Sequence, residues 1–475
     1  MGTLTALLNL SQNALNASQA AIDITSNNVA NANTPGYTDE IATWQENDTV
    51  RISGTVGAGQ GASVSTVSQR DPVLNQRVQQ QTQAASSSAS EGAALTDLQS
   101  IFGITSTSTS PVSTTIGTDM NAFFNSLNAL QASPSDSSVR QGVLSTAQTL
   151  ASDFNSAASQ IAQQTAGLNQ QVSGIVSQIN ALTSAIAGLN LQIESTSPHA
   201  DAGPLEDQRQ QDLTKLSGLI GFDQTKTENN GLTLTTANGA LLVGEGQSWP
   251  LSTAIVNLNI GNGNQSKVDV VSAQGQDITS ALSGGSLGGT LQARDHDLPQ
   301  VSSALNQLAY GITAAVNAQN ADGLDASGNP GGAIFFTWQN VNDAAGTIAV
   351  ATSNPNAIAA ASVGEGTSGS TNATALAALA GATLVNGQTA PQFYASLLTQ
   401  LGSTVSQVSD EHTTQQASLT QLTTQQGSES SVSLDQEAAN LTLYERSYAA
   451  AAKVFTIVDQ LMASALNLGE ETTVS

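Results

Sequence analysis

The chain has 475 residues but no cysteine, and only 10% of its residues are charged and 4% aromatic. Without cysteine, disulfides and thiolate metal sites are excluded. Lysine and arginine together number 11 against 36 acidic residues, a formal net charge of −25. Since such a chain is repelled by phosphate backbones, we expect no nucleic-acid partner. No apolar run reaches the roughly 18 residues of a membrane span. We therefore expect no membrane partner. The first basic residue is Arg51, so the chain lacks the basic start of a secretory signal peptide, and we expect none.

What the chain does have is a long apolar pattern at its end. From 434 to 468, apolar residues follow one another at steps of four and three, as in the seam of a coiled coil. The seam consists of Leu434, Ala438, Leu441, Tyr444, Tyr448, Ala451, Phe455, Val458, Met462 and Ala465. A second row beside it consists of Leu443, Ser447, Ala450, Val454, Ile457, Leu461 and Leu468. This apolar face is too wide for one partner helix.

The first helix supplies a matching face. Leu4, Leu8, Leu15 and Ile22 lie on it together with small alanines. We therefore expect the two ends of the chain to pair. Ordinary core packing is the alternative origin of such stripes, because burial inside a protein is their usual cause.

A turn follows the first helix, in the run NNVANANTPGYT that begins at Asn27. Pro35 fixes one backbone angle, and Gly36 can adopt the positive φ that a type II turn requires. Tyr37 then begins an extended run. With the two helical faces, this turn makes up the candidate assembly interface. Its predicted residues are Leu4, Leu8, Leu15, Ile22, Asn28, Asn31, Pro35, Gly36, Tyr37, Leu434, Leu441, Tyr444, Tyr448, Phe455, Val458 and Met462.

Both ends of the chain resemble one known family, the axial proteins of the bacterial flagellum. The amino-terminal run ASQAAIDITSNNVANANTPGYT and the carboxyl-terminal run LDQEAANLTLYERSYAAAAKVF are each similar to a signature of this family. Asp39 and Glu40 depart from it, since relatives often carry polar or basic residues there. The helix LEDQRQQDLTKLSGLIGF, residues 205–222, resembles the hook-associated protein 1 branch.

The resemblance implies a structural subunit that joins hook to filament as the first junction protein. Its implied partners are copies of itself in a ring or helical zone, the hook protein, the second junction protein and a cytosolic export chaperone that binds the C-terminal region. It also implies export by the flagellar type III apparatus, and hence an extracellular place in the flagellum after a cytosolic stage. The alternatives are another axial protein, of hook or distal rod, or an extracellular adhesin or enzyme with its activity in residues 222–370.

Between the ends we expect a mainly α fold with an inserted β portion. Residues 141–194 keep the four-three alternation for about 50 residues, and 391–429 offers a partner of similar spacing. Asn238 and Gly239 predict a type I′ hairpin, 254–271 predicts a second strand pair, and 291–320 predicts one helix.

We divide the chain into an axial core domain, a rod domain and a small outer domain. The axial core domain consists of the paired helices in residues 1–45 and 430–475. The long helical rod domain consists of residues 46–325 and 371–429, with its β portion at about 222–290. The small outer domain consists of residues 326–370.

Catalysis is not indicated. His199, His296 and His412 are the only histidines, and no second cluster of ligands accompanies them. We expect His296 to be solvated and His412 to lie on a helix seam. Asp322 and Asp325 predict a turn, because the closing glutamate of a calcium loop is missing. We therefore predict no enzyme, no cofactor and no metal.

Overall fold

The fold was determined as a computed structural model. It describes residues 2–47, 60–103, 115–197, 202–244, 246–260, 263–336 and 341–471, so Arg51 and His199 lie outside the described residues.

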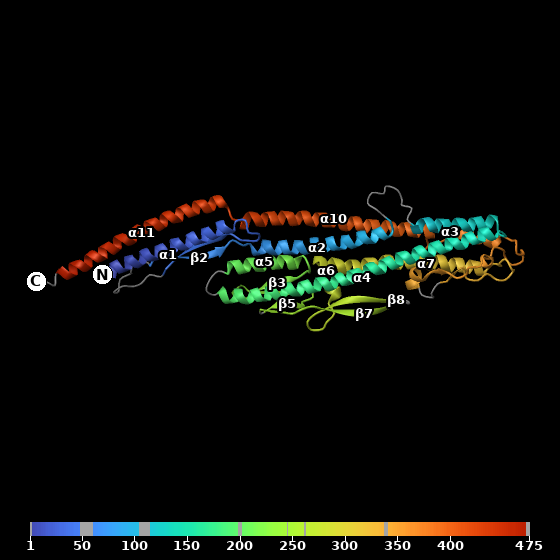
Figure 1. The fold of residues 1–475 in the computed structure, drawn as a ribbon, viewed down its shortest axis with the longest axis horizontal. Helices are drawn as coiled ribbons and strands as arrows, with labels where there is room; N and C mark the ends of the chain where they lie inside the picture. Colours follow the sequence, from blue (N-terminus) through green and yellow to red (C-terminus); the bar gives the residue numbers. More distant parts are fainter. Residues whose placement is uncertain are drawn as a thin grey trace.

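The molecule is a long rod with both chain ends at the same end (Figure 1). Most of its helices run along the rod axis. The helices are α1 (Gly2–Asn31), α2 (Pro72–Ile101), α3 (Thr115–Ala132), α4 (Ser137–Thr196), α5 (Gly203–Ser217), α6 (Gly285–Gln292), α7 (Leu298–Ala321), α8 (Ala344–Thr347), α9 (Thr371–Ala378), α10 (Ala390–Ser430) and α11 (Leu434–Glu471). The strands are β1 (Glu40–Glu46), β2 (Ala62–Ser68), β3 (Asp223–Lys226), β4 (Leu232–Thr235), β5 (Leu241–Gly244), β6 (Gln247–Ser248), β7 (Ser252–Ile260), β8 (Gly263–Val271), β9 (Phe335–Phe336) and β10 (Ala349–Val350).

Helix α4 is the spine of the rod. Its 60 residues span about 90 Å at 1.5 Å per residue. The helix begins after Asp136, whose carboxylate accepts the N–H of Ser138 as an N-cap. The predicted stripe, from Leu150 to Ile193, is buried along most of its length. The helix predicted over 141–194 is therefore confirmed.

The predicted partner of this helix is wrong. α4 packs against α3, α5, α6 and α8, whereas α10 lies along α2 and α7. Buried side chains of α10, including Leu397, Leu401 and Val408, belong to the core that α2 and α7 share. The reason is that a four-three stripe specifies an apolar seam but not which helix fills it. Gln, Ser and Thr on the outer faces add few charges that could select the partner.

The β portion lies against α4 as a four-stranded antiparallel sheet, β3-β4-β5-β6, and a separate ribbon, β7-β8. The predicted strand pair at 254–271 is thereby confirmed as the ribbon. A β4-β5 hairpin also forms, but its turn is not type I′. Gly239 has φ +83°, whereas Asn238 does not have a positive φ. The Thr236 hydroxyl donates to Asn238 Oδ1, which holds a longer loop.

The helix predicted over 291–320 is interrupted. Residues Ala293–Asp297 form a π-helical turn, η3, between α6 and α7. Pro299 has no N–H to donate to the carbonyl of Asp295, so the regular helical ladder cannot pass this point.

The end of the rod far from the termini is built partly from residues 326–370. Ala344, Ala345 and Ile348 are buried in the same hydrophobic cluster as α3, α4 and α7. There Arg140 of α4 is buried and donates to the carbonyls of Pro134 and Ile358. The division into three domains stays a prediction.

Candidate assembly interface

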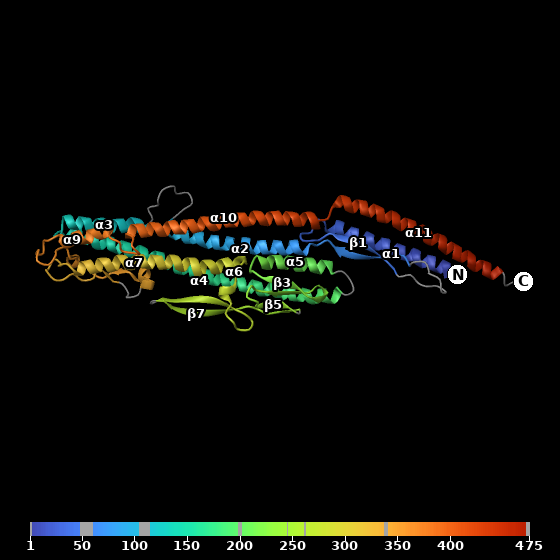
Figure 2. The ribbon, with the colours of Figure 1, turned by 180° about the vertical axis from the view of Figure 1, so that it is seen from behind.

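The terminal helices α1 and α11 lie side by side and run in opposite directions (Figures 1 and 2). The predicted pairing of the two chain ends is therefore confirmed within one molecule. On α1, Ala17, Ala21 and Ile24 are buried, and on α11 Val458 is buried. The small alanines allow the helix axes to approach closely.

The predicted interface residues fall into three classes of burial. Asn28 and Val458 are buried. Half-buried are Leu4, Leu8, Leu15, Ile22, Asn31, Tyr37, Leu441, Tyr444, Phe455 and Met462. Pro35, Gly36, Leu434 and Tyr448 are exposed. Contacts of these residues with other subunits stay a prediction.

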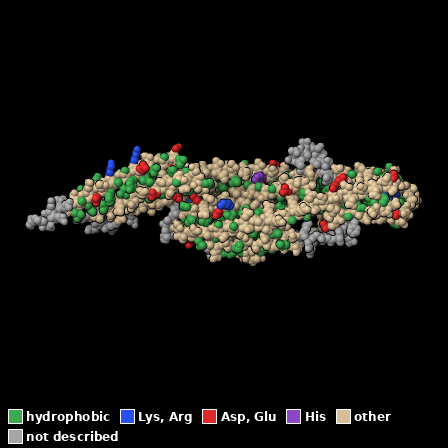
Figure 3. Space-filling view, viewed as in Figure 1, with side chains coloured by type: hydrophobic (Ala, Val, Ile, Leu, Met, Phe, Trp, Pro, Cys, Tyr) green, Lys and Arg blue, Asp and Glu red, His purple; other side chains and the backbone are tan. Residues whose placement is uncertain are grey.

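The second row on α11 is an uncovered apolar surface of this end. Four of its large members are exposed, namely Leu443, Val454, Ile457 and Leu461, and Leu466 is exposed beside them. Figure 3 shows hydrophobic side chains gathered over α1 and α11, with few charges among them. A contiguous apolar patch of this kind marks a site of protein contact. Of the two apolar rows on α11, the seam thus packs against α1, and the second row, which we call the open row, remains exposed to solvent.

The hairpin β1-β2 covers another side of α1 and also touches α11. The ring centroids of Trp44, on β1, and Tyr444, on α11, are 6.2 Å apart. Trp44 nevertheless remains half exposed. The axial end is therefore a small bundle of two helices and a hairpin.

Asn28 joins α1 to the hairpin. Its side-chain Nδ2 donates to Asp39 Oδ1 (2.7 Å) and to the carbonyl of Glu40 (2.8 Å). Its Oδ1 accepts from the Tyr37 hydroxyl (2.8 Å) and from the Glu40 N–H (3.1 Å). Every hydrogen-bonding site of this buried amide is thus occupied, and the side chain holds the turn against the helix.

The turn has the predicted type. The Tyr37 N–H donates to the carbonyl of Thr34 (3.2 Å), and Gly36 between them has φ +79°. With Pro35 and Gly36 at the two central positions, this is a type II turn. A Cβ at Gly36 would lie 2.7 Å from Gln211 Nε2 of α5, so that side chain would have to move, and the positive φ is the stronger reason for glycine here.

After the turn, Thr38 is bound to the rod. The Thr38 hydroxyl donates to Asp207 Oδ1 (2.6 Å), and its N–H donates to Asp207 Oδ2 (3.0 Å). Arg70, at the start of α2, donates to Asp207 Oδ1 (2.9 Å from Nη2), to the Gly203 carbonyl (2.6 Å) and to Glu206. We call this set, Thr38, Arg70, Gly203, Glu206 and Asp207, the joint.

The joint stands beside a cavity of about 570 Å³ between the turn, α2, α5 and the end of α10. The backbone also crosses here, because the Asp39 N–H donates to the carbonyl of Ser430 (2.9 Å). The axial bundle is therefore tied to the rod at a few polar contacts rather than through a shared core.

The surroundings of Asp39, which follows the turn, disfavour the charged form of its carboxyl group. Burial and the nearby carboxylate of Glu437 raise the pKa of Asp39 to about 6. Burial and the surrounding carboxylates also raise the pKa of Tyr37. Glu437 itself is buried at the start of α11. Protonation of Asp39 therefore stabilises this part of the bundle.

Comparison with known proteins agrees with this arrangement. The family described as "Flagellar hook-associated protein FlgK helical domain" matches residues 102–335. "Flagella basal body rod protein" matches 8–38, and "Flagellar basal body rod FlgEFG protein C-terminal" matches 425–468. The flagellar hook-associated protein 1 of Bacillus subtilis is 27% identical over 501 aligned residues, which cover 97% of each chain. This chain belongs to the flagellar hook-associated protein 1 family.

Two further relatives support that assignment. The Escherichia coli hook-associated protein 1 is 29% identical over 70% of this chain and 60% of its own. The solved structure of the flagellar hook junction protein FlgK from Burkholderia pseudomallei has the same fold, with a TM-score of 0.66 and 22% identity. That match covers 76% of this chain and all of the other.

The family matches at the two ends contain all of the candidate interface residues except Leu4. Residues 8–38 contain most of α1, the turn and Thr38, and residues 425–468 contain most of α11. The sequence analysis missed Arg70 and Asp207. Asp207 lies in the 205–222 segment that was recognised only as a mark of the family branch, and Arg70 is one of just 11 basic residues.

The histidines and the aspartate that were considered as candidate site residues lie on the surface, on a helix seam and in a turn. His296 is exposed on η3 and its ring lies 2.9 Å from Asp297 Oδ1, so its predicted solvation is confirmed. The predicted seam position of His412 is confirmed by its contact with the carbonyl of Ala85 on α2 (3.2 Å). Asp325 Oδ1 accepts the N–H groups of Ser327 and Asn329, as expected for a turn. Among the residues that the structure describes, no group of three or more His, Asp and Glu could hold a metal ion.

Two stretches of described helix are long and apolar enough to cross a membrane by length and composition alone, Ser137–Thr196 and Ala390–Leu466. The first is α4, whose apolar residues fill the rod core. The second includes the open row on α11. This row belongs to the candidate assembly interface, and the absence of a membrane partner stays a prediction.

Proposed function

We propose that this chain is the structural subunit of the bacterial flagellum that joins the hook to the filament as the first junction protein. Copies assemble through their terminal helices, and the rod points away from the assembled bundle. We assign the chain no enzymatic activity, in keeping with its relatives, which are flagellar structural proteins.

The open apolar row on α11 is the observation that carries this proposal. Within one molecule, α1 packs against the seam side of α11, and the row from Leu443 to Leu461 is exposed. A helix pair alone has too small a core to be stable, so most of its stability must come from packing against other molecules. Identical helices of neighbouring copies fit this requirement.

The partners follow from the position in the flagellum. The hook protein binds on one side and the second junction protein on the other, with copies of this chain in a ring or helical zone between them. In the cytosol a chaperone binds the C-terminal region, since the open row would otherwise promote aggregation. The subunit then leaves through the flagellar export apparatus and resides outside the cell.

The test is complementation with the double variant Ile457→Asp and Leu461→Asp in a strain that lacks its own copy of the gene. Both side chains are exposed in the free chain, so we expect a folded protein with unchanged helical circular dichroism. We expect the cells to stop swimming in soft agar. Electron microscopy should show bare hooks, and filament protein should appear in the medium.

The control is Val363→Asp, which replaces an exposed apolar side chain by a negatively charged one on the other end of the rod. We expect this variant to restore swimming. Normal swimming with the double variant at normal protein level would contradict the proposal.

A further inference from the structure

Four asparagines of this chain stand directly before a glycine. The pairs are Asn230–Gly231, Asn238–Gly239, Asn262–Gly263 and Asn386–Gly387. In such a pair the glycine nitrogen can attack the asparagine side chain, because glycine has no Cβ that would hinder the approach. The reacting pair is the same in all four, so the folded structure determines which of them reacts. Asn262 lies outside the described residues.

Asn386 and Gly387 form the tip of a two-residue turn shortly before α10. Both have a positive φ, 48° and 75°, as a type I′ turn requires. Val385 and Gln388 close the turn, since each donates its N–H to the carbonyl of the other (3.2 and 2.9 Å). Both residues at the tip are exposed. Solvent therefore reaches the side chain and the backbone of this pair.

The backbone nitrogen of this pair is unprotected. The Gly387 N–H has no acceptor among the residues that the structure describes. The side-chain amide of Asn386 is held at one point, where Nδ2 donates to Gln307 Oε1 of α7 (2.9 Å). The attacking nitrogen is therefore open to solvent, and the amide that it attacks is held by a single hydrogen bond at the surface.

In the other two described pairs the glycine N–H is bound. The Gly239 N–H donates to the carbonyl of Thr236 (2.8 Å), and the Gly231 N–H donates to the carbonyl of Glu228 (3.1 Å). Gly231 is also buried. A bound N–H is protected from loss of its proton, as the slow hydrogen exchange of such amides shows. Of the three described pairs, the one with an unbound N–H is that of Gly387.

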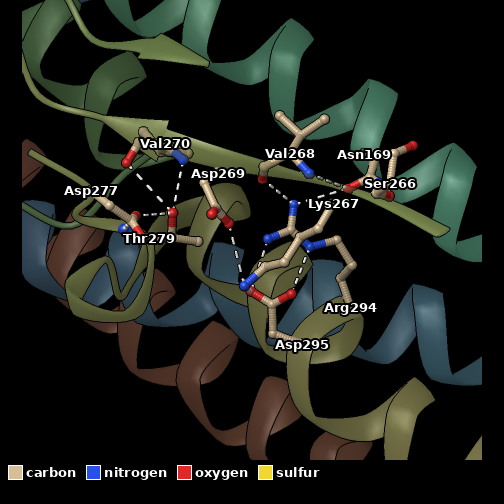
Figure 4. Close-up of polar contacts among 10 residues, drawn as sticks. All are labelled: Asn169, Ser266, Lys267, Val268, Asp269, Val270, Asp277, Thr279, Arg294 and Asp295. Atoms are coloured by element: carbon tan, nitrogen blue, oxygen red, sulfur yellow. Dashed lines mark hydrogen bonds and ion pairs between the residues drawn. The ribbon is translucent and has the colours of Figure 1, made fainter. Parts of the chain in front are cut away.

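An asparagine in the rod core shows how full hydrogen bonding holds the amide. Asn169 of α4 is buried and lies between β8 and η3 (Figure 4). Its Nδ2 donates to the carbonyl of Ser266 (2.8 Å), and its Oδ1 accepts from the Val268 N–H (3.1 Å) and from Arg294 Nη1 (3.1 Å). This amide cannot turn toward the following backbone nitrogen without breaking all three bonds. Asn386, with one bond at the surface, lacks this protection.

We propose that Asn386 is a modification site of this chain, at which the side chain deamidates spontaneously. The Gly387 nitrogen loses its proton to a base from the solvent and attacks Cγ of Asn386. As the new bond from nitrogen to Cγ forms, the bond from Cγ to Nδ2 breaks, and Nδ2 takes up a proton and leaves as ammonia. Water then opens the resulting succinimide ring at either of its carbonyls. The product is aspartate or isoaspartate, so the reaction consumes water and releases ammonia.

The modification changes how this turn is held against α7. A carboxylate at position 386 has no hydrogen to donate to Gln307 Oε1, and it adds a negative charge to a chain that already carries −25. In isoaspartate the backbone runs through the side chain and gains a methylene group, so Val385 and Gln388 no longer close a two-residue turn. Thr389, the N-cap of α10, follows directly. Conversion therefore loosens the entry to α10, and it does so whether or not the chain is a junction protein.

The experiment is incubation of the purified full chain at mildly alkaline pH, followed by peptide mass spectrometry. Cleavage after glutamate, carried out at acidic pH to slow further reaction, isolates residues 229–245 with two of the pairs and residues 366–411 with Asn386. Deamidation appears as a mass increase at the asparagine. A hydrogen bond that must first open reduces the reactive fraction about five-fold, so Asn386 should react about five-fold faster than Asn238. Asn230, whose glycine is buried, should be the slowest of the three.

Two controls separate the effect of the fold from that of the sequence. In concentrated urea the bound N–H groups are released, so the same three asparagines should react at similar rates. Gly387→Ala places a Cβ beside the attacking nitrogen and should slow the reaction at Asn386 in the folded chain and in urea alike. A rate at Asn386 in the folded chain no higher than at Asn238, or a difference that persists in urea, would overturn the proposal. An unchanged rate in Gly387→Ala would overturn the assigned step.

Discussion

Thr38 and Asp207 are joined by two hydrogen bonds, of 2.6 and 3.0 Å, across 169 residues of chain. Thr38 ends the turn that follows the first helix, and Asp207 lies on α5 of the rod. Arg70 binds the same carboxylate from the start of α2. One aspartate therefore links the turn to α2 and α5, and it is among the few polar contacts that tie the axial bundle to the rod.

Replacing that aspartate should loosen the joint. In Asp207→Ala, the Thr38 groups lose their acceptor and Arg70 loses one of its two carboxylates. Because Arg70 is only partly buried and keeps Glu206, we expect a loss of about 2 kcal/mol in the free energy of unfolding, from the unpaired Thr38 groups and the weakened ion pair. Urea denaturation followed by circular dichroism measures it. Gln208→Ala, an exposed change on the same helix, should be near neutral. Equal stability of the two variants would contradict the role of the joint.

Asn28 should be the most sensitive amide of the first helix. Asn28→Ala removes four hydrogen bonds and leaves the Tyr37 hydroxyl and the Glu40 N–H without their acceptor. Leaving buried polar groups unpaired costs about 2–3 kcal/mol. The neighbouring Asn27 is exposed, so Asn27→Ala is the matched control. Thermal unfolding should separate the two variants, and an equal shift in both would contradict this role of the Asn28 side chain.

The stability of the axial bundle should fall as pH rises. The pKa of Asp39 is raised from 3.8 to about 6, first by burial and then by Glu437. The folded protein thus keeps this proton at a pH where the unfolded chain has lost it. The resulting stabilisation is present at low pH and is lost as pH rises through about 6.

Asp39→Asn tests this dependence directly. Because its side chain at this position is neutral, the variant should be more stable than the parent protein at pH 7.5. Its melting temperature should also fall less than that of the parent between pH 5 and 7.5. Glu91 and Asp153 also have pKa values raised to about 7, so the parent retains other pH dependence in the same direction. Asp435→Asn, at an exposed site, should leave the slope unchanged. An identical slope in Asp39→Asn and the parent would refute the assignment.

Two neighbours on α11 should behave in opposite ways. Val458 is buried against α1, whereas Ile457 is exposed on the open row. Val458→Ala should lower the stability of the free chain by about 2 kcal/mol, because it leaves a cavity in the seam. Ile457→Ala should leave the free chain unchanged and weaken assembly. Melting temperatures of the purified monomers measure the stability of the free chain, and swimming assays measure assembly. Equal melting temperatures would mean that the two rows do not differ as the structure shows.

Several features follow from local chemistry and were predictable. The type II turn needs only Pro35 and Gly36 in order, because each residue restricts or permits one backbone angle. The helix predicted over 141–194 needs only its periodic stripe. Where local chemistry was ambiguous, prediction failed. Asn238 and Gly239 suit several loop lengths, and the Thr236 side chain selected a longer one than the type I′ turn.

By itself, the sequence determined which residues of this protein are helical, which faces are apolar, that the two ends match, and that α11 has one apolar row too many. Periodicity encodes these properties because they depend on neighbours within a few turns of chain. Only the tertiary structure decided that α10 lies on α2 rather than on α4, and that Asp207 binds Thr38 and Arg70. These choices depend on groups far apart in the chain, where apolar seams of similar spacing are interchangeable and only three-dimensional packing selects the partner.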